Sequence, residues 1–143
     1  MLAAITVTAV VTVSLLYLGP RIADFGALSS RQIDNMLFRR LDEYQRAYQE
    51  SSDLQAIVTT ALTDPSHLDS DERRIYTDHE KRFFGGWEAA WEYHLEGRLD
   101  SERYNVWNRW YVAEARRRPR FAWTENRERY SDGFADHVDK SLK

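Results

Sequence analysis

The stretch FFGGWEAAWEYHLEGRLDSERYNVWNRWYVAEARRRPRFAW, residues 83–123, contains all five tryptophans of the chain. Apolar and aromatic side chains recur at helical spacing on both sides of a short turn sequence within it. In that turn, Gly97 suits the left-handed conformation that ends a helix, and Asp100 suits the position that caps the next one. The pattern predicts two antiparallel helices with an aromatic seam between them.

Helical periodicity continues on both sides of this hairpin. In the helix that precedes the others, Ile33, Leu37 and Leu41 form one apolar stripe. No strand pattern competes outside the N-terminal apolar run. The predicted class is therefore all-α, with an N-terminal transmembrane helix followed by a small bundle of about five helices built round the hairpin. The expected helices cover residues 30–50, 54–62, 70–96, 101–117 and 121–139.

Capping residues support several of these boundaries. Asp69 stands three residues before Glu72, as a capping box requires at the start of the long helix. Ser29 and Gln32 have the same spacing at the start of the first helix. Pro119 is expected to end the helix over residues 101–117.

Glycines interrupt two of the predicted helices. Gly85 and Gly86 lie in the middle of the long helix, where each costs about 1 kcal/mol relative to alanine. A close helix crossing or a kink is the expected reason for them. Gly133 lies in the last predicted helix and is expected to loosen it locally.

Residues 1–20 form a separate apolar segment. The seventeen residues from Leu2 to Leu18 carry no charge, and as a helix they would span about 25 Å, the short end of a membrane span. No basic residue precedes the run and no Ala-x-Ala-like site follows it, so an uncleaved transmembrane anchor is favoured over a secretory signal. A buried helix of a larger assembly and an atypical signal are the alternatives. Residues 21–29 are predicted to form a juxtamembrane linker.

The basic residues around the apolar run all lie on its C-terminal side. Arg21 follows it directly, and Arg31, Arg39 and Arg40 come later. The positive-inside rule then places the N-terminus outside and the helical domain, residues 30–143, in the cytoplasm. This predicts a single-pass protein of the inner cell membrane, with the lipid bilayer as its first partner.

The composition narrows the functional classes. A chain of 143 residues suits one domain with at most a short appendage. Because the chain has no cysteine, disulfides and thiolate metal sites are excluded. The net charge of −3 is too small to indicate a partner of opposite charge.

Several features follow one another in an order that resembles a known group of proteins. These features are the apolar N-terminus, a helix rich in Leu and Arg, the cluster around Trp87, the turn over residues 97–102, Tyr104 with Trp107, and then Trp123, Tyr130 and Phe134 after Pro119. Most of residues 30–140 thereby resembles a loose set of bacterial, membrane-anchored, all-helical proteins classed as domains of unknown function. The resemblance implies a helical fold and a membrane location, and it supplies no catalytic residues.

The histidines do not match metal-binding motifs. His79-Glu80 begins like a zinc-protease motif, but Phe83 stands where the second histidine belongs. A di-iron bundle needs Glu-x-x-His on two helices, whereas aromatic residues stand three positions earlier: Tyr76 before His79, Trp91 before His94 and Phe134 before His137. We therefore expect core histidines, with no metal and no cofactor.

Motifs for catalysis are also missing from the sequence. Neither Gly-x-Ser-x-Gly nor the phosphate-binding Gly-x-x-x-x-Gly-Lys-Ser/Thr occurs. Glu88, Glu92 and Glu96 repeat every four residues, which is more typical of a solvated helix face than of a paired-acid site. No feature argues for an enzyme.

Arg116, Arg117, Arg118 and Arg120 form the most concentrated charge in the sequence. One interpretation is a helix C-terminus whose cations complement the helix dipole. On a membrane-tethered domain the run could instead contact anionic lipid. The net acidity of the whole chain argues against nucleic acid as the partner.

The aromatic residues allow two interpretations. Trp87 and Trp91 on one helix, and Trp107 and Trp110 on the next, have spacings that let antiparallel helices interlock as a core. Any exposed remainder would be a protein-binding patch, where Trp and Tyr are enriched. The candidate core or pocket consists of His79, Trp87, Trp91, His94, Trp107, Trp110 and Trp123.

Two functional hypotheses follow. The first is a non-enzymatic interaction or accessory module, anchored in the membrane and binding a membrane or cytoplasmic protein. The alternative is a ligand-sensing or regulatory domain. In that case a cavity between the long helix and the last two, lined by His79, His94 and Trp107, would hold a small molecule.

Overall fold

The computed structural model describes residues 30–143, and every regular element in that range is helical. The predicted all-α class is confirmed, with six α-helices in the described residues. They are a leading helix over residues 30–49, then α2 (Ser52–Thr63), α3 (Ser70–Leu95), α4 (Ser101–Arg117), α5 (Arg120–Thr124) and α6 (Asp132–Ser141). A 3-10 turn, η1 (Pro65–His67), lies between α2 and α3, and a second, η2 (Arg127–Arg129), lies between α5 and α6.

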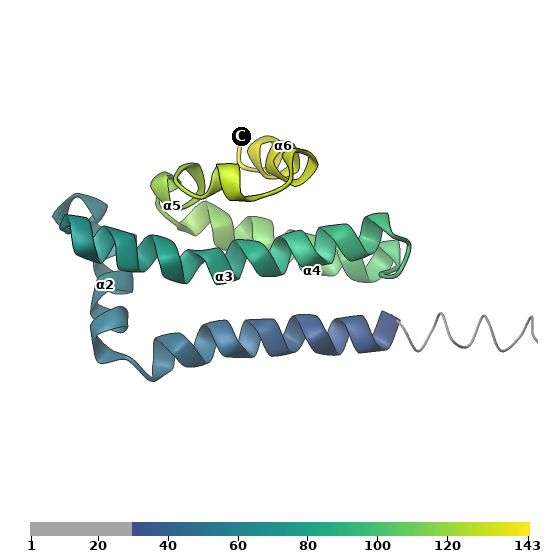
Figure 1. Cartoon of the computed structure of the whole chain (residues 1–143), viewed down its shortest axis with the longest axis horizontal. Helices are drawn as coiled ribbons and strands as arrows, with labels where there is room; N and C mark the ends of the chain where they lie inside the picture. Colours follow the sequence, from purple (N-terminus) through teal and green to yellow (C-terminus); the bar gives the residue numbers. More distant parts are fainter. Residues whose placement is uncertain (1–29) are drawn as a thin grey trace, which may run out of the picture.

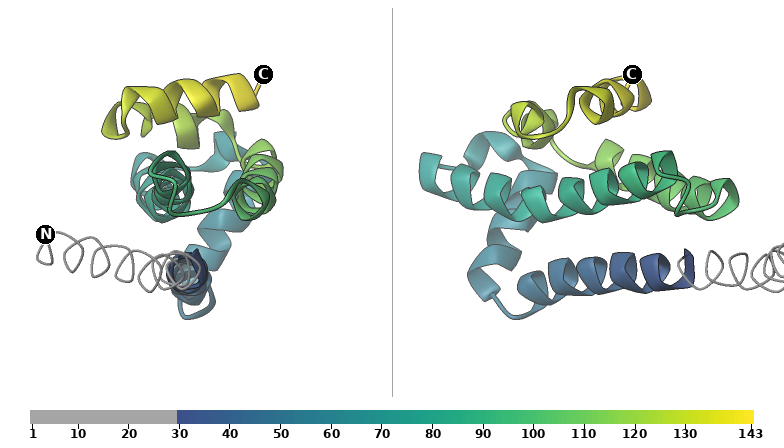
Figure 2. Two further views of the ribbon diagram at one scale, coloured as in Figure 1. Left: turned by 90° about the vertical axis from the view of Figure 1, so that its right-hand side faces the viewer. Right: turned by 45° about the vertical axis from the view of Figure 1, so that its right-hand side comes forward.

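The helices form three layers (Figure 1). The antiparallel pair α3 and α4 makes the middle layer, the leading helix lies against one side of it, and α5 and α6 cover the other. The end-on view in Figure 2 shows the pair between its two covering layers. The short helix α2 stands across one end and joins the leading helix to α3. The predicted bundle around a helical hairpin is confirmed.

The turn of the hairpin follows the sequence closely. Gly97 has φ of 69°, the left-handed conformation predicted for it. Its N–H donates to the carbonyl of His94 at 3.0 Å, and the N–H of Arg98 donates to the carbonyl of Tyr93 at 2.9 Å. These two bonds form a Schellman motif, which satisfies the last carbonyls of α3. The side chain of Asp100 then accepts from the N–H of Arg103 and caps α4.

The long helix begins at the predicted capping box. The Asp69 side chain accepts from the N–H of Glu72, and the Glu72 side chain accepts from the N–H of Asp69. Both bonds satisfy backbone donors that have no partner within the helix.

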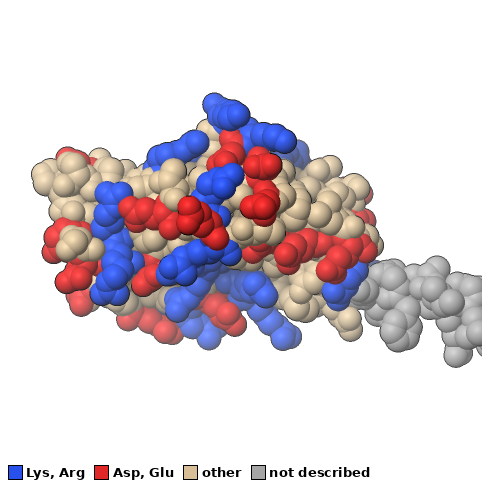
Figure 3. All heavy atoms as spheres, turned by 45° about the horizontal axis from the view of Figure 1, so that its top comes forward, with Lys and Arg blue, Asp and Glu red and all other residues tan. Residues whose placement is uncertain are grey.

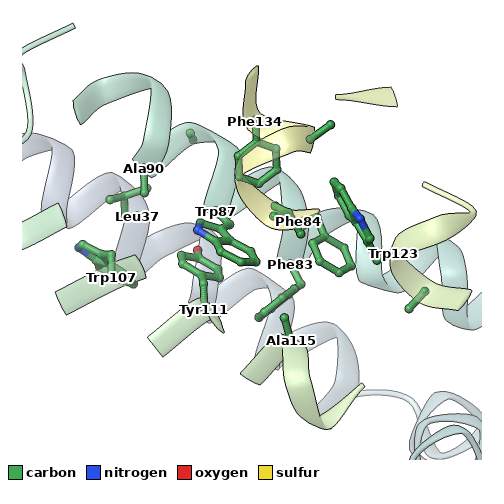
Figure 4. Close-up of a cluster of buried hydrophobic side chains, with 14 of the residues drawn as sticks. Leu37, Phe83, Phe84, Trp87, Ala90, Trp107, Tyr111, Ala115, Trp123 and Phe134 are labelled. Carbon is green, nitrogen blue, oxygen red and sulfur yellow. The ribbon is translucent and has the colours of Figure 1, made fainter. Parts of the chain in front are cut away.

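The interior of the hairpin is built from rings that meet across α3, α4, α5 and α6. Trp87 and Tyr111 lie face to face, with ring centroids 5.7 Å apart and planes 2° from parallel. Phe134 stands edge-on to Trp87 and to Trp123. Figure 4 shows this cluster, in which Trp87, Trp123 and Phe134 are almost fully removed from solvent. Burial of such large rings is a major source of stability for a domain of this size.

Of the two adjacent glycines in α3, only one is required by packing. A Cβ atom on Gly86 would lie 2.5 Å from the hydroxyl oxygen of Tyr111, whereas a Cβ on Gly85 would meet nothing within 4 Å. Gly86 therefore marks a close crossing between α3 and α4, one of the two reasons expected for the glycine pair. Gly133 has a similar role in α6, because its Cβ would lie 2.9 Å from Trp91.

The single last helix predicted over residues 121–139 is wrong. The chain forms α5, η2 and α6 instead, with Tyr130 in an extended conformation between η2 and α6. Polar contacts with α3 and α5 accompany this break in the helix. The side chain of Asn126 donates to the carbonyls of Thr77 and Ala122, and the N–H of Ser131 donates to Glu88 at 2.9 Å. These contacts bend the chain back over α3.

The predicted membrane anchor over residues 1–20 and the linker over residues 21–29 lie outside the described residues, as does the Ser29 cap. Within residues 30–143, no helix combines the length and the apolar character needed to cross a bilayer.

Candidate functional site

The four arginines of the predicted basic surface do not act together. Arg118 is buried, with 10% of its side chain exposed, and it enters the interface between the leading helix and the hairpin. The others lie at the surface, where Arg116 donates to the carbonyl of Ser141 and Arg120 to that of Leu142. Arg117 pairs with Glu114 at 3.1 Å. On the face shown in Figure 3, basic and acidic side chains are interspersed rather than separated.

A buried polar network joins Arg118 to Glu80 and Tyr44. The Arg118 Nε atom donates to Glu80 Oε2 at 2.5 Å, and its Nη2 atom donates to the Tyr44 hydroxyl at 2.9 Å. That hydroxyl donates in turn to Glu80 Oε1 at 2.9 Å. The guanidinium also lies 3.8 Å above the centre of the Phe83 ring. The network links the leading helix, α3 and the end of α4.

Burial changes the ionisation of these groups. It raises the pKa of the Glu80 carboxyl, while Arg118 and the Tyr44 hydrogen bond act in the opposite direction. Desolvation lowers the pKa of Arg118, but its contacts with Glu80 and Tyr44 outweigh this and the pKa is raised. Burial likewise raises the pKa of Tyr44. With Glu80 only 1% exposed, the network is a structural tie that offers solvent no acid or base.

The seven predicted core or pocket residues are divided between two environments. Trp87, Trp107, Trp123 and His79 are buried, whereas Trp91, His94 and Trp110 are partly exposed. The ring of His94 stacks on Tyr104 at 4.2 Å. The predicted common lining by His79, His94 and Trp107 does not form, because His79 and Trp107 line two different hollows.

The first of these hollows is an apolar groove of about 360 Å³ between the leading helix and α4. Phe38 and Val106 line it with 59% and 56% of their surfaces exposed. The Phe38 ring packs on Trp107 at 4.8 Å. At the end nearest the hairpin turn, Asp34 and Arg103 form an ion pair at 2.6 Å. We call this the aromatic groove; Leu41 and Trp110 complete its lining.

The second hollow, of about 440 Å³, lies where α2 meets α3. Its polar lining includes Asp53, Asp78, His79 and Arg82. Burial, together with the nearby charges of Arg82 and Arg118, lowers the pKa of His79 to about 4. His79 is therefore neutral near pH 7. Within residues 30–143, no group of three or more His, Asp or Glu side chains is placed to hold a metal ion.

Among the aromatic-groove residues that were not predicted as site residues, Phe38 and Val106 carry the same signal. Phe38 lies beside the apolar stripe of the leading helix rather than on it, and Val106 lies beside the aromatic stripe of α4. A large apolar residue off the buried stripe of an amphipathic helix is left exposed. Asp53 and Arg82 carry no comparable signal, because charged residues on a helix surface are ordinary.

Comparison of the chain with protein-family models, with curated proteins and with solved structures gives no match.

Proposed function

We propose that this protein is a non-enzymatic interaction module that binds an amphipathic helix of a partner protein in the aromatic groove. Residues 1–20 anchor it in a membrane, and residues 30–143 lie on the cytoplasmic side. The observation that carries the proposal is the exposure of Phe38 and Val106 on neighbouring helices, above the ring of Trp107. Contiguous exposed apolar side chains of this kind typify surfaces that bind another protein.

The shape of the groove favours a helix as its occupant. Two contacts show that the leading helix and α4 run parallel: Asp34 pairs with Arg103 near their starts, and Tyr44 bonds Arg118 near their ends. A third helix lying between two parallel helices can place side chains three and four residues apart into the furrow.

The charges at the groove favour apolar recognition. The Asp34 carboxylate is already paired with Arg103, and it accepts a second bond from the Trp107 indole N–H at 3.2 Å. Because these charges compensate each other, the groove has little charge left with which to select a partner. We infer that a partner presents leucine-like or aromatic side chains, with its own charges at the rim.

The membrane part of the proposal rests on the sequence. The uncharged run from Leu2 to Leu18 precedes every basic residue of the chain. We expect the full chain to sediment with membranes and to be released by detergent but not by high salt. A chain that stays in the supernatant would contradict the anchor and leave the groove proposal to its own test.

The groove is tested by site-specific photocrosslinking in cells that make the full chain. A benzophenone amino acid at position 38 should give one reproducible adduct whose cross-linked segment is an amphipathic helix. The matched control places the same group at Leu95, which is 64% exposed but does not line the groove.

Binding between the purified chain and a synthetic peptide then tests the groove directly. A synthetic peptide of the cross-linked segment should bind the full chain, and Val106→Asp should weaken that binding about tenfold or more, since it puts a charge in an apolar contact. An adduct to lipid or to a second copy of this chain would overturn the proposed partner. Peptide binding that Val106→Asp leaves unchanged would overturn the groove.

The second candidate function is ligand sensing. A different observation favours it, namely the polar hollow beside His79, which does not border the aromatic groove.

A further inference from the structure

The polar hollow is formed where α2 crosses the first half of α3, at the end of the bundle where the leading helix also finishes (Figure 1). Ser51, Asp53, Leu54 and Ile57 line it from the α2 side. Ile75, Asp78, His79 and Arg82 line it from α3, at the three- and four-residue spacing of one helix face. Its volume of about 440 Å³ is enough for a small organic molecule and too small for a folded partner.

His79 is the residue that points to a ligand. It is only 5% exposed, and neither of its ring nitrogens has a hydrogen-bond partner in the described protein. One face of the ring is covered by Tyr44, with the centroids 4.3 Å apart. A neutral imidazole carries one donor and one acceptor, and buried polar atoms of proteins are nearly always bonded. His79 lines the hollow, and a molecule there can supply one of these bonds when the ring turns toward it, because both nitrogens are buried in the described protein.

The charged groups of the hollow are not all equally available. The Asp78 carboxylate is compensated by an ion pair with Lys81, and the guanidinium of Arg74 lies 3.9 Å away. Asp53 and Arg82 form no hydrogen-bonded or ion-paired contact through their side chains within residues 30–143. The hollow therefore offers a ligand one carboxylate and one guanidinium, which together complement a molecule with both signs of charge.

The remaining wall is aliphatic. Leu54, Ile57 and Ile75 face the hollow between the charged groups. Ile75 is 40% exposed in the described protein. A ligand that covers it would remove apolar surface from water, a favourable change.

We propose that this hollow is a binding site for a free α-amino acid with an aliphatic side chain. The ligand carboxylate pairs with Arg82, and its ammonium group pairs with Asp53. The His79 ring turns so that one nitrogen donates to the carboxylate, and the aliphatic side chain packs on Ile57 and Ile75. The site goes beyond the interaction function proposed for the aromatic groove and shares no residue with it.

Calorimetric titration of the purified 143-residue chain with leucine tests the site, with two analogues that each lack one charge. Leucinamide has no carboxylate, and 4-methylpentanoate has no ammonium group. Arg82→Gln should weaken leucine binding about tenfold while leaving leucinamide binding nearly unchanged, since one charge-assisted bond is lost. Asp53→Asn should weaken leucine binding about tenfold while leaving 4-methylpentanoate binding nearly unchanged.

Matched controls separate this effect from a general loss of charge. Arg109→Gln removes an exposed arginine on α4, outside the hollow. Asp132→Asn removes an exposed carboxylate from the first turn of α6, as Asp53 lies in the first turn of α2. Both control variants should bind leucine with unchanged affinity.

A second readout follows His79 directly. On addition of leucine, the imidazole nitrogen resonances of His79 should shift, while those of exposed His67 stay in place. Absence of leucine binding at millimolar concentration would overturn the proposal. Equal weakening of leucine and leucinamide by Arg82→Gln would overturn the assigned carboxylate contact. Neither result bears on partner binding in the aromatic groove, so the two proposals fail separately.

Discussion

The hairpin of α3 and α4 is covered on its two sides by layers held in different ways. On the α5–α6 side, Trp87, Trp123 and Phe134 bury their rings almost completely against one another. On the other side, the leading helix buries the smaller side chains Ile33 and Leu37, and it is fixed by hydrogen bonds and ion pairs.

This difference in packing gives the two sides different roles. The α5–α6 side stabilises the fold, and the leading-helix side carries the open hollows. Interlocked rings fill space and leave little room for a ligand. Polar ties such as Asp34 with Arg103 hold two helices at fixed points, and side chains between these points stay partly exposed. The aromatic groove and the polar hollow both border the leading helix or its junction with α2.

The largest expected effect comes from removing a ring on the α5–α6 side. Trp87→Ala should lower the free energy of unfolding by about 3–5 kcal/mol, because it leaves a cavity among Tyr111, Phe134 and His137. Urea unfolding followed by far-UV circular dichroism measures the change. Phe38→Ala is the matched control on the open side and should cost far less, since Phe38 is mostly exposed. Equal costs would remove the distinction between the two sides.

On the leading-helix side, the free energy of unfolding should depend on a buried charge rather than on side-chain volume. Arg118→Met should cost about 3–5 kcal/mol, because it leaves the buried Glu80 carboxylate without its cation. Replacing both partners, as Glu80→Leu with Arg118→Met, should cost less than the single change. Arg117→Met is the control, and a change below about 0.5 kcal/mol is expected at that exposed position. A single variant as stable as its control would mean that the network does not hold the layers together.

Burial of His79 on the leading-helix side should make the protein less stable as the pH falls. The folded-state pKa of His79 is about 4, below its ordinary value of 6.5. Between these values the unfolded chain binds a proton that the folded chain does not, so stability is lost as the pH falls from 6.5 to 4. The loss amounts to as much as roughly 3 kcal/mol. The pKa of His137 is also lowered by burial, so that group acts in the same direction.

Comparison of the native chain with His79→Gln isolates the His79 contribution. The variant should lose less stability than the native chain between pH 6.5 and 4.5 in urea unfolding. Parallel pH profiles for the native chain and His79→Gln would contradict the burial assigned to His79.

Local rules were enough to predict the hairpin. Gly97, Asp100 and the Asp69–Glu72 pair act through backbone groups within a few residues of themselves. The helical spacing of the large rings also predicted which sides of α3 and α4 would meet. Such signals depend on neighbours in the sequence, and a single chain therefore contains them in full.

Contacts between distant residues could not be predicted in this way. Arg118 directly precedes Pro119, which predicts that it ends the helix. No local signal predicts that its side chain reaches Glu80, 38 residues away. The break after α5 likewise depends on Asn126 bonding Thr77, 49 residues away. The two hollows arise where separate elements meet, so their linings combine residues that no local pattern connects.

The smallest effect distinguishes the two glycines of α3, which look identical in the sequence. Gly86→Ala should cost about 1–3 kcal/mol, since its methyl group would lie 2.5 Å from the Tyr111 hydroxyl and the buried ring must move. Gly85→Ala has open space and should stabilise α3 by about 0.5–1 kcal/mol through helix propensity. Thermal unfolding of the two variants measures this difference. Tyr111→Phe should restore part of the loss in Gly86→Ala, because it removes the oxygen that the methyl group meets. If Gly85→Ala and Gly86→Ala change stability in the same direction, α3 and α4 do not cross as closely at Gly86 as the contact with Tyr111 requires.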